Sequence, residues 1–285
     1  MKRRDFLKIA VMGAIGWGIA PGVMAQDMTA PARASLPENF DYNNIKDYLH
    51  RMEHFDEPQA GDVRINMAEY RVFESVVMRL RRLQQLVGHG NFQKLSFDRG
   101  IRIARTYSEV GEFTREETAF MEKIFYTDAS LYGFFGEKTM PNITDSVRVK
   151  DVVRVPYPYT GNYLYKGTPL ETFKKIRRQV GEDVRLTSGI RGIMKQFLLF
   201  LNKAYRHGGN LSLASRSLAP PGYSFHANGD FDVGQAGLGA DNFTGRFTTT
   251  KVYKRLTDLG YLTLRYPRKN LLGVRFEPWH IKVPA

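Results

Sequence analysis

Acidic and imidazole residues gather in two short stretches near the end of the chain. The first holds His226, Asp230 and Asp232, and the second holds Glu277 three residues before His280. Two imidazoles and one carboxylate are enough to hold a catalytic zinc ion that keeps one position open for water. A further carboxylate that lies near the metal without binding it can deprotonate that water. These residue types therefore predict metal-dependent hydrolysis.

A third stretch supplies a cation. Arg191 lies in Ser188-Gly189-Ile190-Arg191-Gly192, and Gln196 follows five residues after the arginine. A guanidinium group can hold a substrate carboxylate through two parallel hydrogen bonds, or stabilise a developing oxyanion.

The chain contains no cysteine, which excludes disulfides, thiolate metal sites and a cysteine nucleophile. A metal must therefore be held by carboxylates and by some of the six histidines, which are His50, His54, His89, His207, His226 and His280. We expect His89 and His207, which adjoin glycines, to be turn residues.

The three stretches, in this order, resemble the VanY-type D-alanyl-D-alanine carboxypeptidases. This group of zinc peptidases also contains the VanX dipeptidases and the hedgehog signalling domain. The family pattern is S-G-Y-R-S with a later Gln, then P-G-x-S-x-H-x-x-G-x-A-x-D, and finally R-Y-P followed by E-P-W-H. The chain matches it at Ser188, Gly189, Arg191, Gln196, Pro221, Gly222, Ser224, His226, Gly229, Arg265, Tyr266, Pro267, Glu277, Pro278, Trp279 and His280.

The resemblance implies a zinc site and a base. His226, Asp232 and His280 would hold Zn²⁺, and Glu277 would act as general base on water and then as acid toward the leaving amine. The chain departs from the family at the metal aspartate, which follows the first histidine by seven residues, because Val233 occupies that position here.

Two aspartates therefore compete for the role of ligand. Asp230 and Asp232 are two residues apart, so both project from the same face if this segment is extended. We favour Asp232 because it precedes Val233 in a predicted core strand, which would hold the ligand rigidly. Asp230 follows the flexible Gly229 and suits a supporting role, in which it orients a histidine ring or the water.

The resemblance also implies substrate contacts. Arg191 would bind or polarise the carboxy-terminal part of the substrate, and Ser224 and Gln196 would make secondary contacts. Trp279 would pack beside the site or contact substrate. Ile190 and Gly192 replace the Tyr and Ser that flank the arginine in the family.

The predicted activity is hydrolysis of the terminal D-Ala-D-Ala bond of peptidoglycan stem peptides. The same site could serve a cell-wall endopeptidase, an L,D-carboxypeptidase or a D-Ala-D-Ala dipeptidase. A wall-binding module without activity is a further alternative, although binding alone does not require Glu277.

The predicted fold class is α+β, with a small antiparallel sheet and flanking helices that hold the zinc site, preceded by a helical amino-terminal region. The expected division is an export signal over 1–25, a linker over 26–40, a helical region over 41–149 and a catalytic domain over 150–285.

Hydrophobic periodicity locates the main elements. Thr114 and Glu117 have the spacing of a capping box at a helix start. Further helices are predicted over 67–87, 170–180, 189–204 and 249–259. Short β-branched runs lie over 147–155, and strands are predicted over 184–187, 261–266 and 274–283.

The net charge of +13 indicates attraction to polyanions. No nucleic-acid-binding motif accompanies the charge, so nucleic acid is not the expected partner, and an anionic polymer such as a bacterial cell wall fits.

The first 25 residues have the features of an export signal. A basic cluster precedes a short apolar stretch that glycines interrupt, and small residues precede the predicted cleavage site after Ala25. The run Arg3-Arg4-Asp5-Phe6-Leu7-Lys8 resembles the twin-arginine signal. We expect a periplasmic protein that uses the twin-arginine translocase and keeps no membrane span once the signal is removed.

Changing Arg3 and Arg4 together to lysine is expected to strand the precursor in the cytoplasm. Immunoblotting of cell fractions measures this outcome. Normal processing of the double variant in cells that lack the twin-arginine translocase would show instead that the general secretory route suffices.

Overall fold

The computed structural model describes residues 45–155 and 161–284. The chain divides into two units, Met1–Arg33 and Ala34–Ala285, and the described residues all lie in the second. The predicted export signal and linker lie outside the described residues. Among the helices that are described, none has the length and apolar character needed to cross a membrane.

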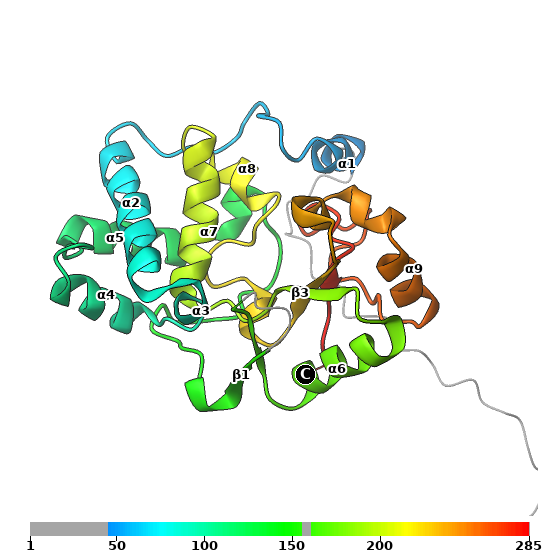
Figure 1. Cartoon of the computed structure of the whole chain (residues 1–285). Helices are drawn as coiled ribbons and strands as arrows, with labels where there is room; N and C mark the ends of the chain where they lie inside the picture. Colours follow the sequence, from blue (N-terminus) through cyan, green and yellow to red (C-terminus); the bar gives the residue numbers. More distant parts are fainter. Residues whose placement is uncertain (1–44, 156–160, 285) are drawn as a thin grey trace, which may run out of the picture. The chain divides into compact units, whose positions relative to one another are not determined.

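Helices predominate in the first part of the described chain, and helices and short strands alternate after it (Figure 1). The helices are α1 Ile45–Glu53, α2 Tyr70–Val87, α3 His89–Phe92, α4 Phe97–Thr106, α5 Arg115–Tyr126, α6 Thr168–Val180, α7 Ile193–Arg206, α8 Leu211–Ser215 and α9 Lys251–Asp258. The strands are β1 Val152–Arg154, β2 Tyr163–Tyr165, β3 Val184–Ser188, β4 Phe231–Gln235 and β5 His280–Ile281.

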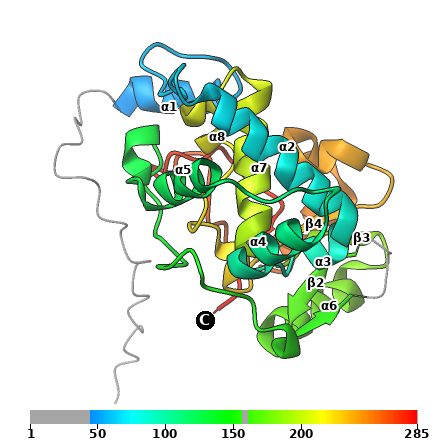
Figure 2. The same cartoon turned by 90° about the vertical axis from the view of Figure 1, so that its left-hand side faces the viewer.

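The helices share a core to which α7 belongs. On α2, Phe73, Val77 and Leu80 recur at helical spacing and are fully buried. Phe197 and Leu201 of α7 are buried in the same cluster. Both views show α2 lying along α7 (Figures 1 and 2). A helix that follows residue 150 thus completes the core of helices that precede it, while the proposed boundary at 149/150 stays a prediction.

The capping box predicted at the start of α5 is confirmed. Thr114 accepts a hydrogen bond from the backbone N–H of Glu117, and the Glu117 carboxylate accepts one from the backbone N–H of Thr114. That carboxylate also accepts a hydrogen bond from Arg79 of α2, with 2.9 Å between Arg79 Nε and Glu117 Oε2. Because the Glu117 side chain is only 3% exposed, this ion pair joins α2 to α5 inside the helical core.

A three-stranded antiparallel sheet forms the second core. Its strand order is β3-β4-β5, and β1 and β2 pair separately as an antiparallel ribbon. Phe231 and Val233 of β4 are buried with Phe173 of α6 and Leu256 of α9. The predicted α+β class, with a small antiparallel sheet, flanking helices and a helical amino-terminal region, is confirmed.

Two predicted strands near the end of the chain are wrong in extent. The segment 261–266 forms no strand, and only His280–Ile281 of the segment 274–283 pairs with β4. Pro278, within the segment 274–283, lacks the N–H group that a continuous ladder requires. Pairing with β4 is confined to the two residues of β5.

The helix predicted from residue 189 begins at Ile193 instead. Ile190 donates its backbone N–H to Tyr163 O. Gly189 lies so close to β2 that an added Cβ would lie 2.1 Å from the same oxygen. This close approach holds residues 189–192 against β2 as an extended loop that leads into α7.

Glu117→Ala is expected to destabilise the protein by about 3–5 kcal/mol, because it leaves Arg79 as a buried unpaired charge and removes the helix cap. Urea unfolding followed by circular dichroism measures the change. Glu112→Ala, which breaks the exposed pair with Arg105, is the matched control and should cost under about 1 kcal/mol. Equal losses in the two variants would contradict the structural role of the buried pair.

Candidate metal centre and catalytic cleft

Strand β4 places Asp232 at the centre of the site. Side chains alternate along a strand, so Phe231 and Val233 enter the core while Asp232 faces the other side. In the antiparallel register, Asp232 lies opposite His280 of β5 and opposite Ser188 of β3. The sheet therefore brings His280 and Ser188, which belong to the second and third motif stretches, next to Asp232 of the first.

His226 reaches the same place from a loop. It lies in a short 3₁₀ turn, Phe225–Ala227, just before β4, and its side chain is 2% exposed. Gly229 has φ +115°, a conformation that favours glycine, and it allows the chain to turn from His226 into the strand.

The geometry of these three side chains fits a zinc ion. His226 Nε2 lies 3.3 Å from Asp232 Oδ1, and His280 Nδ1 lies 3.2 Å from the same oxygen. Zinc–ligand bonds of about 2.0–2.1 Å in a tetrahedron place ligand atoms roughly 3.3 Å apart. Asp232 Oδ1 and His280 Nδ1 are buried and have no hydrogen-bond partner. Within the described residues, this is the group of three acidic or imidazole side chains whose ligand atoms converge.

Outer contacts fix the orientation of both imidazoles. His226 Nδ1 lies 2.7 Å from the carbonyl oxygen of Gly189, to which it can donate, and this leaves Nε2 free for the metal. His280 Nε2 lies 2.9 Å from Asp230 Oδ2 and directs Nδ1 toward Asp232. Asp230 in turn accepts from Arg265 Nε at 2.6 Å. Asp232 thus lies within the cluster, and Asp230 lies behind it.

The charges around the cluster favour the metal-binding form of two of its members, Asp232 and His226. Burial would raise the pKa of Asp232, but His226 and Arg191 hold it well below its usual value. Burial, followed by the charge of Arg191, lowers the pKa of His226. Both groups are therefore unprotonated near neutral pH, as metal ligands must be.

His280 and Asp230 form a coupled pair. Burial would lower the pKa of His280, but hydrogen bonds and charges from Asp230 and Asp232 raise it to about 9. Burial would raise the pKa of Asp230, but His280 and then Arg265 lower it to about 2. Metal binding at His280 Nδ1 must therefore release a proton.

Glu277 lies at the edge of this cluster. Its Oε2 is 3.7 Å from His280 Nδ1, which is too far for a hydrogen bond but close to the position of the predicted metal. Burial, with repulsion from Asp232, raises the pKa of its carboxyl group, while the charge of His280 opposes the rise. The side chain remains 14% exposed and lines the cleft.

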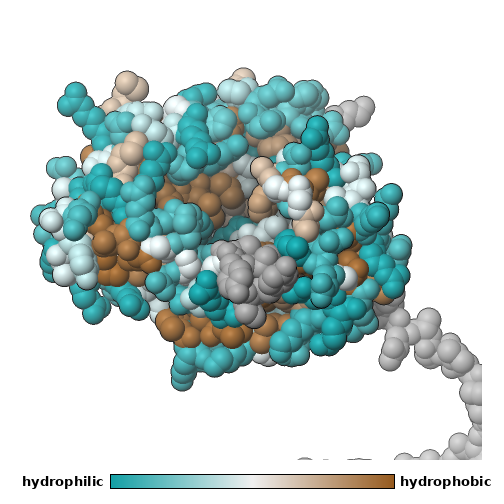
Figure 3. All heavy atoms as spheres, in the orientation of Figure 1, coloured by the Kyte–Doolittle hydropathy of each residue, from teal (hydrophilic) through white to brown (hydrophobic). Residues whose placement is uncertain are grey.

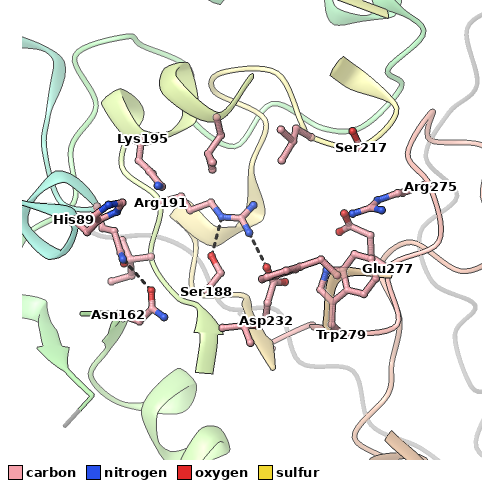
Figure 4. Close-up of a pocket in the computed structure, with 16 residues that line it drawn as sticks. His89, Asn162, Ser188, Arg191, Lys195, Ser217, Asp232, Arg275, Glu277 and Trp279 are labelled. Atoms are coloured by element: carbon pink, nitrogen blue, oxygen red, sulfur yellow. Dashed lines mark hydrogen bonds and ion pairs between the residues drawn. The ribbon is translucent and has the colours of Figure 1, made fainter. Parts of the chain in front are cut away.

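Arg191 contacts the cluster directly. Its Nη2 donates to Asp232 Oδ2 at 2.6 Å, and its Nε donates to Ser188 Oγ at 3.0 Å (Figure 4). The arginine predicted to hold substrate therefore also holds a predicted metal ligand. Its Nη1 makes no hydrogen bond recorded within the described part of the chain, and the side chain is 18% exposed.

The other predicted substrate residues lie around the cluster. Gln196 is buried, accepts from Gly222 N at 2.8 Å and donates to Arg191 O at 2.8 Å, so it braces two of the loops. Ser224 lines a small inner pocket that it shares with His226 and His280. Trp279 is 2% exposed and packs edge-on against Phe243. The substrate contacts of these residues stay predictions.

A cleft of about 400 Å³ opens beside the cluster. Three predicted site residues line it: Asp232, Glu277 and Arg191. Four further lining residues were not predicted as site residues: Lys195, Arg275, Gln93 and His89. His89 begins α3, so the predicted turn is wrong. Lys195 and Arg275 lie beside recognised motif residues, but nothing in the sequence places Gln93 or His89 near them. The molecular surface is hollowed near the middle of the face seen in Figure 3.

Residues 166–283 match the family model described as VanY, D-alanyl-D-alanine carboxypeptidase. The resemblance predicted from the motifs is confirmed for this part of the chain. The comparison with curated proteins found no match.

Two solved structures are similar to the chain. One is the LdcB LD-carboxypeptidase, whose structure reveals the molecular basis of peptidoglycan recognition by that protein. It has 23% sequence identity to this chain and a TM-score of 0.40, and the match covers 48% of this chain and 69% of that one. A glutamate-to-alanine mutant of the vancomycin-resistance D,D-pentapeptidase VanY, from a VanB-type cassette and in complex with Zn(II), has 25% identity and a TM-score of 0.36. That match covers 46% of this chain and 77% of the other.

Asp232→Ala is expected to abolish stoichiometric zinc binding, because it removes the oxygen that both imidazoles face. Asp230→Ala should keep the site but weaken zinc affinity by about 10–100-fold, since Asp230 orients His280 and is not one of the three converging side chains. Native mass spectrometry and competition with a chelator measure both variants. A metal-free Asp230→Ala beside a zinc-loaded Asp232→Ala would reverse the assignment.

Proposed function

We propose that the protein is an exported zinc-dependent D-alanyl-D-alanine carboxypeptidase that acts on peptidoglycan stem peptides. The observation that carries the proposal is the convergence of His226, Asp232 and His280, with Glu277 beside them, next to a cleft that Asp232 and Glu277 line. The match of residues 166–283 to a carboxypeptidase family supports the same reaction class.

Zinc, when bound, supplies a Lewis acid that makes a water molecule nucleophilic near neutral pH. The three side chains fit this ion because both imidazole nitrogens lie 3.2–3.3 Å from Asp232 Oδ1, and because Asp232 Oδ1 and His280 Nδ1 are buried without a hydrogen-bond partner among the described residues. The remaining chemistry falls to the residues of the chain.

Glu277 is suited to move the proton. It lies close to the cluster without being one of the three converging side chains, and its raised pKa brings it nearer to the working pH. In the proposed reaction, Glu277 Oε2 takes a proton from the attacking water and passes it to the amine of the departing amino acid. A carboxylate with direct access to both groups can serve both steps.

Arg191 has two roles in this proposal. Its Nη2 and Nε hold Asp232 and Ser188, which keeps the guanidinium plane fixed. Nη1 remains for the carbonyl oxygen or terminal carboxylate of the substrate. Asp232 already offsets part of the charge of Arg191. The fixed orientation of its N–H donors toward the substrate is therefore as important as its charge.

The basic cleft fits a substrate with a free carboxy-terminus. Arg191, Lys195 and Arg275 line it, against only two acidic residues, Asp232 and Glu277. An L,D-carboxypeptidase would share these features, so product identity separates the two activities. Export through the twin-arginine pathway, which the amino-terminal motif supports, would bring the enzyme to this substrate in the periplasm.

The parent protein is expected to release D-alanine from a pentapeptide stem ending in D-Ala-D-Ala, and a chelator should stop the reaction. Glu277→Ala should still bind about one zinc ion while losing about 10²–10⁴ in kcat. Liquid chromatography of the products, with zinc analysis of each protein, gives both results. Release of D-alanine only from a tetrapeptide would favour the L,D-carboxypeptidase, and near-parent activity in Glu277→Ala would remove this residue from the mechanism.

A further inference from the structure

Arg275 lines the cleft two residues before Glu277, and the proposed reaction gives it no step. In Figure 4 the guanidinium of Arg275 and the carboxylate of Glu277 point toward each other. Burial lowers the pKa of Arg275, while the charge of Glu277, followed by that of Asp232, opposes the fall. No ion pair or hydrogen bond joins the two side chains in the described part of the chain. Glu277 is therefore the carboxylate that Arg275 attracts most, although the two do not touch.

Aromatic stacking fixes the guanidinium of Arg275. Its Cζ lies 4.7 Å from the ring centroid of Phe55 and 4.8 Å from that of Trp279. Its backbone N–H donates to Arg216 O at 2.8 Å, while its Nε is buried without a hydrogen-bond partner among the described residues. Guanidinium groups stack favourably on aromatic faces. The two rings therefore set the position of this charge.

Arg216, which follows α8, holds Phe55 in turn. Its Nε donates to Phe55 O at 3.1 Å, and its Nη2 donates to Glu57 O at 2.9 Å. Its Nη1 lies 2.7 Å from Asp62 Oδ1, in an ion pair whose two side chains are buried. Phe55 and Asp62 precede residues 166–283, the stretch that matches the family. A segment outside that stretch thus fixes a cation of the cleft.

The direction of the Glu277 carboxylate decides what it can do. Its Oε2 lies 3.7 Å from His280 Nδ1, an atom predicted to bind the metal. A carboxylate this close can turn and bind the ion itself, which fills the position that a catalytic zinc keeps open for water. The charge of Arg275, which lines the cleft, draws the carboxylate away from this alternative.

We propose, on the basis of the proposed function, that Arg275 is a positioning residue for Glu277. Its stacked guanidinium holds the Glu277 carboxylate on the cleft side of the predicted metal, so that Glu277 acts on water and does not become a fourth protein ligand. Because Phe55 forms half of the stack, the segment that precedes the family match helps to place the general base.

Kinetics on a stem peptide that ends in D-Ala-D-Ala test this role. Arg275→Met removes the charge but keeps an unbranched side chain between the rings. It should lower kcat by about 10–100-fold, with KM within about threefold of the parent. Arg275→Lys, which keeps the charge, should recover at least about half of this loss on a logarithmic scale. Phe55→Ala should lower kcat by about 3–30-fold, because it removes one face of the stack.

Arg81→Met is the matched control. Arg81 stacks over the ring of Tyr205 at 5.2 Å, as Arg275 stacks on Phe55, but it does not line the cleft. Its kcat should stay within about twofold of the parent. Equal losses of kcat in Arg81→Met and Arg275→Met would overturn the positioning role. A rise in KM at unchanged kcat in Arg275→Met would also overturn it, since the arginine would then bind substrate.

Zinc affinity, measured by competition with a chelator, gives a readout that needs no substrate. Arg275→Met should bind zinc about tenfold more tightly than the parent, because the released Glu277 carboxylate adds a ligand. In full-length Glu277→Ala, the same substitution should change the affinity by less than about threefold. An equal gain in both backgrounds would reflect only the lost positive charge, and would count against the role of Arg275.

The two readouts separate the positioning role from the proposed function. If the parent cleaves no stem peptide while the zinc affinities couple Arg275 to Glu277, the proposed function fails and the positioning role stands. If the parent releases D-alanine while Arg275→Met keeps the parental kcat and zinc affinity, the proposed function stands and the positioning role is rejected.

Discussion

The arrangement of the site depends on the two oxygens of Asp232. Oδ2 accepts from Arg191, and Oδ1 faces the imidazoles of His226 and His280 without a hydrogen bond of its own. The carboxylate is held between a fixed cation and a place for a metal ion because β4 is the central strand of the sheet. A buried carboxylate needs compensation for its charge. Arg191 supplies it at Oδ2, and the predicted metal would supply it at Oδ1.

This constraint explains why the surrounding loops are so closely tied. Gly189 provides the carbonyl that orients His226, and its close approach to Tyr163 fixes that carbonyl against β2. Gln196 joins the Arg191 loop to Gly222, which precedes His226. A displacement of any of these loops alters the spacing between the predicted ligand atoms, and metal affinity is sensitive to that spacing.

The sequence predicted the composition of the cluster better than the contacts around it. His226, Asp232, Glu277 and His280 stand in motifs, and the structure brings them together, while their roles stay predictions. The preference for Asp232 over Asp230 rested on an expected core strand, and β4 supplies that strand. The contact between Arg191 and Asp232 depends on the register of β3 with β4, which includes an irregularity between Leu186 and Ser188 that no local pattern reveals.

Prediction was weakest where tertiary contacts decide the outcome. The segment 261–266 has the composition of a strand, yet it pairs with none of the strands in the described residues. Gln93 and His89 reach the cleft only because α2 and α7 share a core, so the sequence around α3 carries no sign of it.

The sharing of α7 between the helical core and the cleft bears on how such a protein can evolve. Its buried face packs with α2, while the loop and first turn at its start carry Arg191 and Lys195. The stretch that matches the family is therefore not the smallest unit that recombination could transplant, because moved alone it would expose the apolar face of α7 and lose one wall of the cleft. A transplanted unit would have to include α2 together with the predicted catalytic motifs.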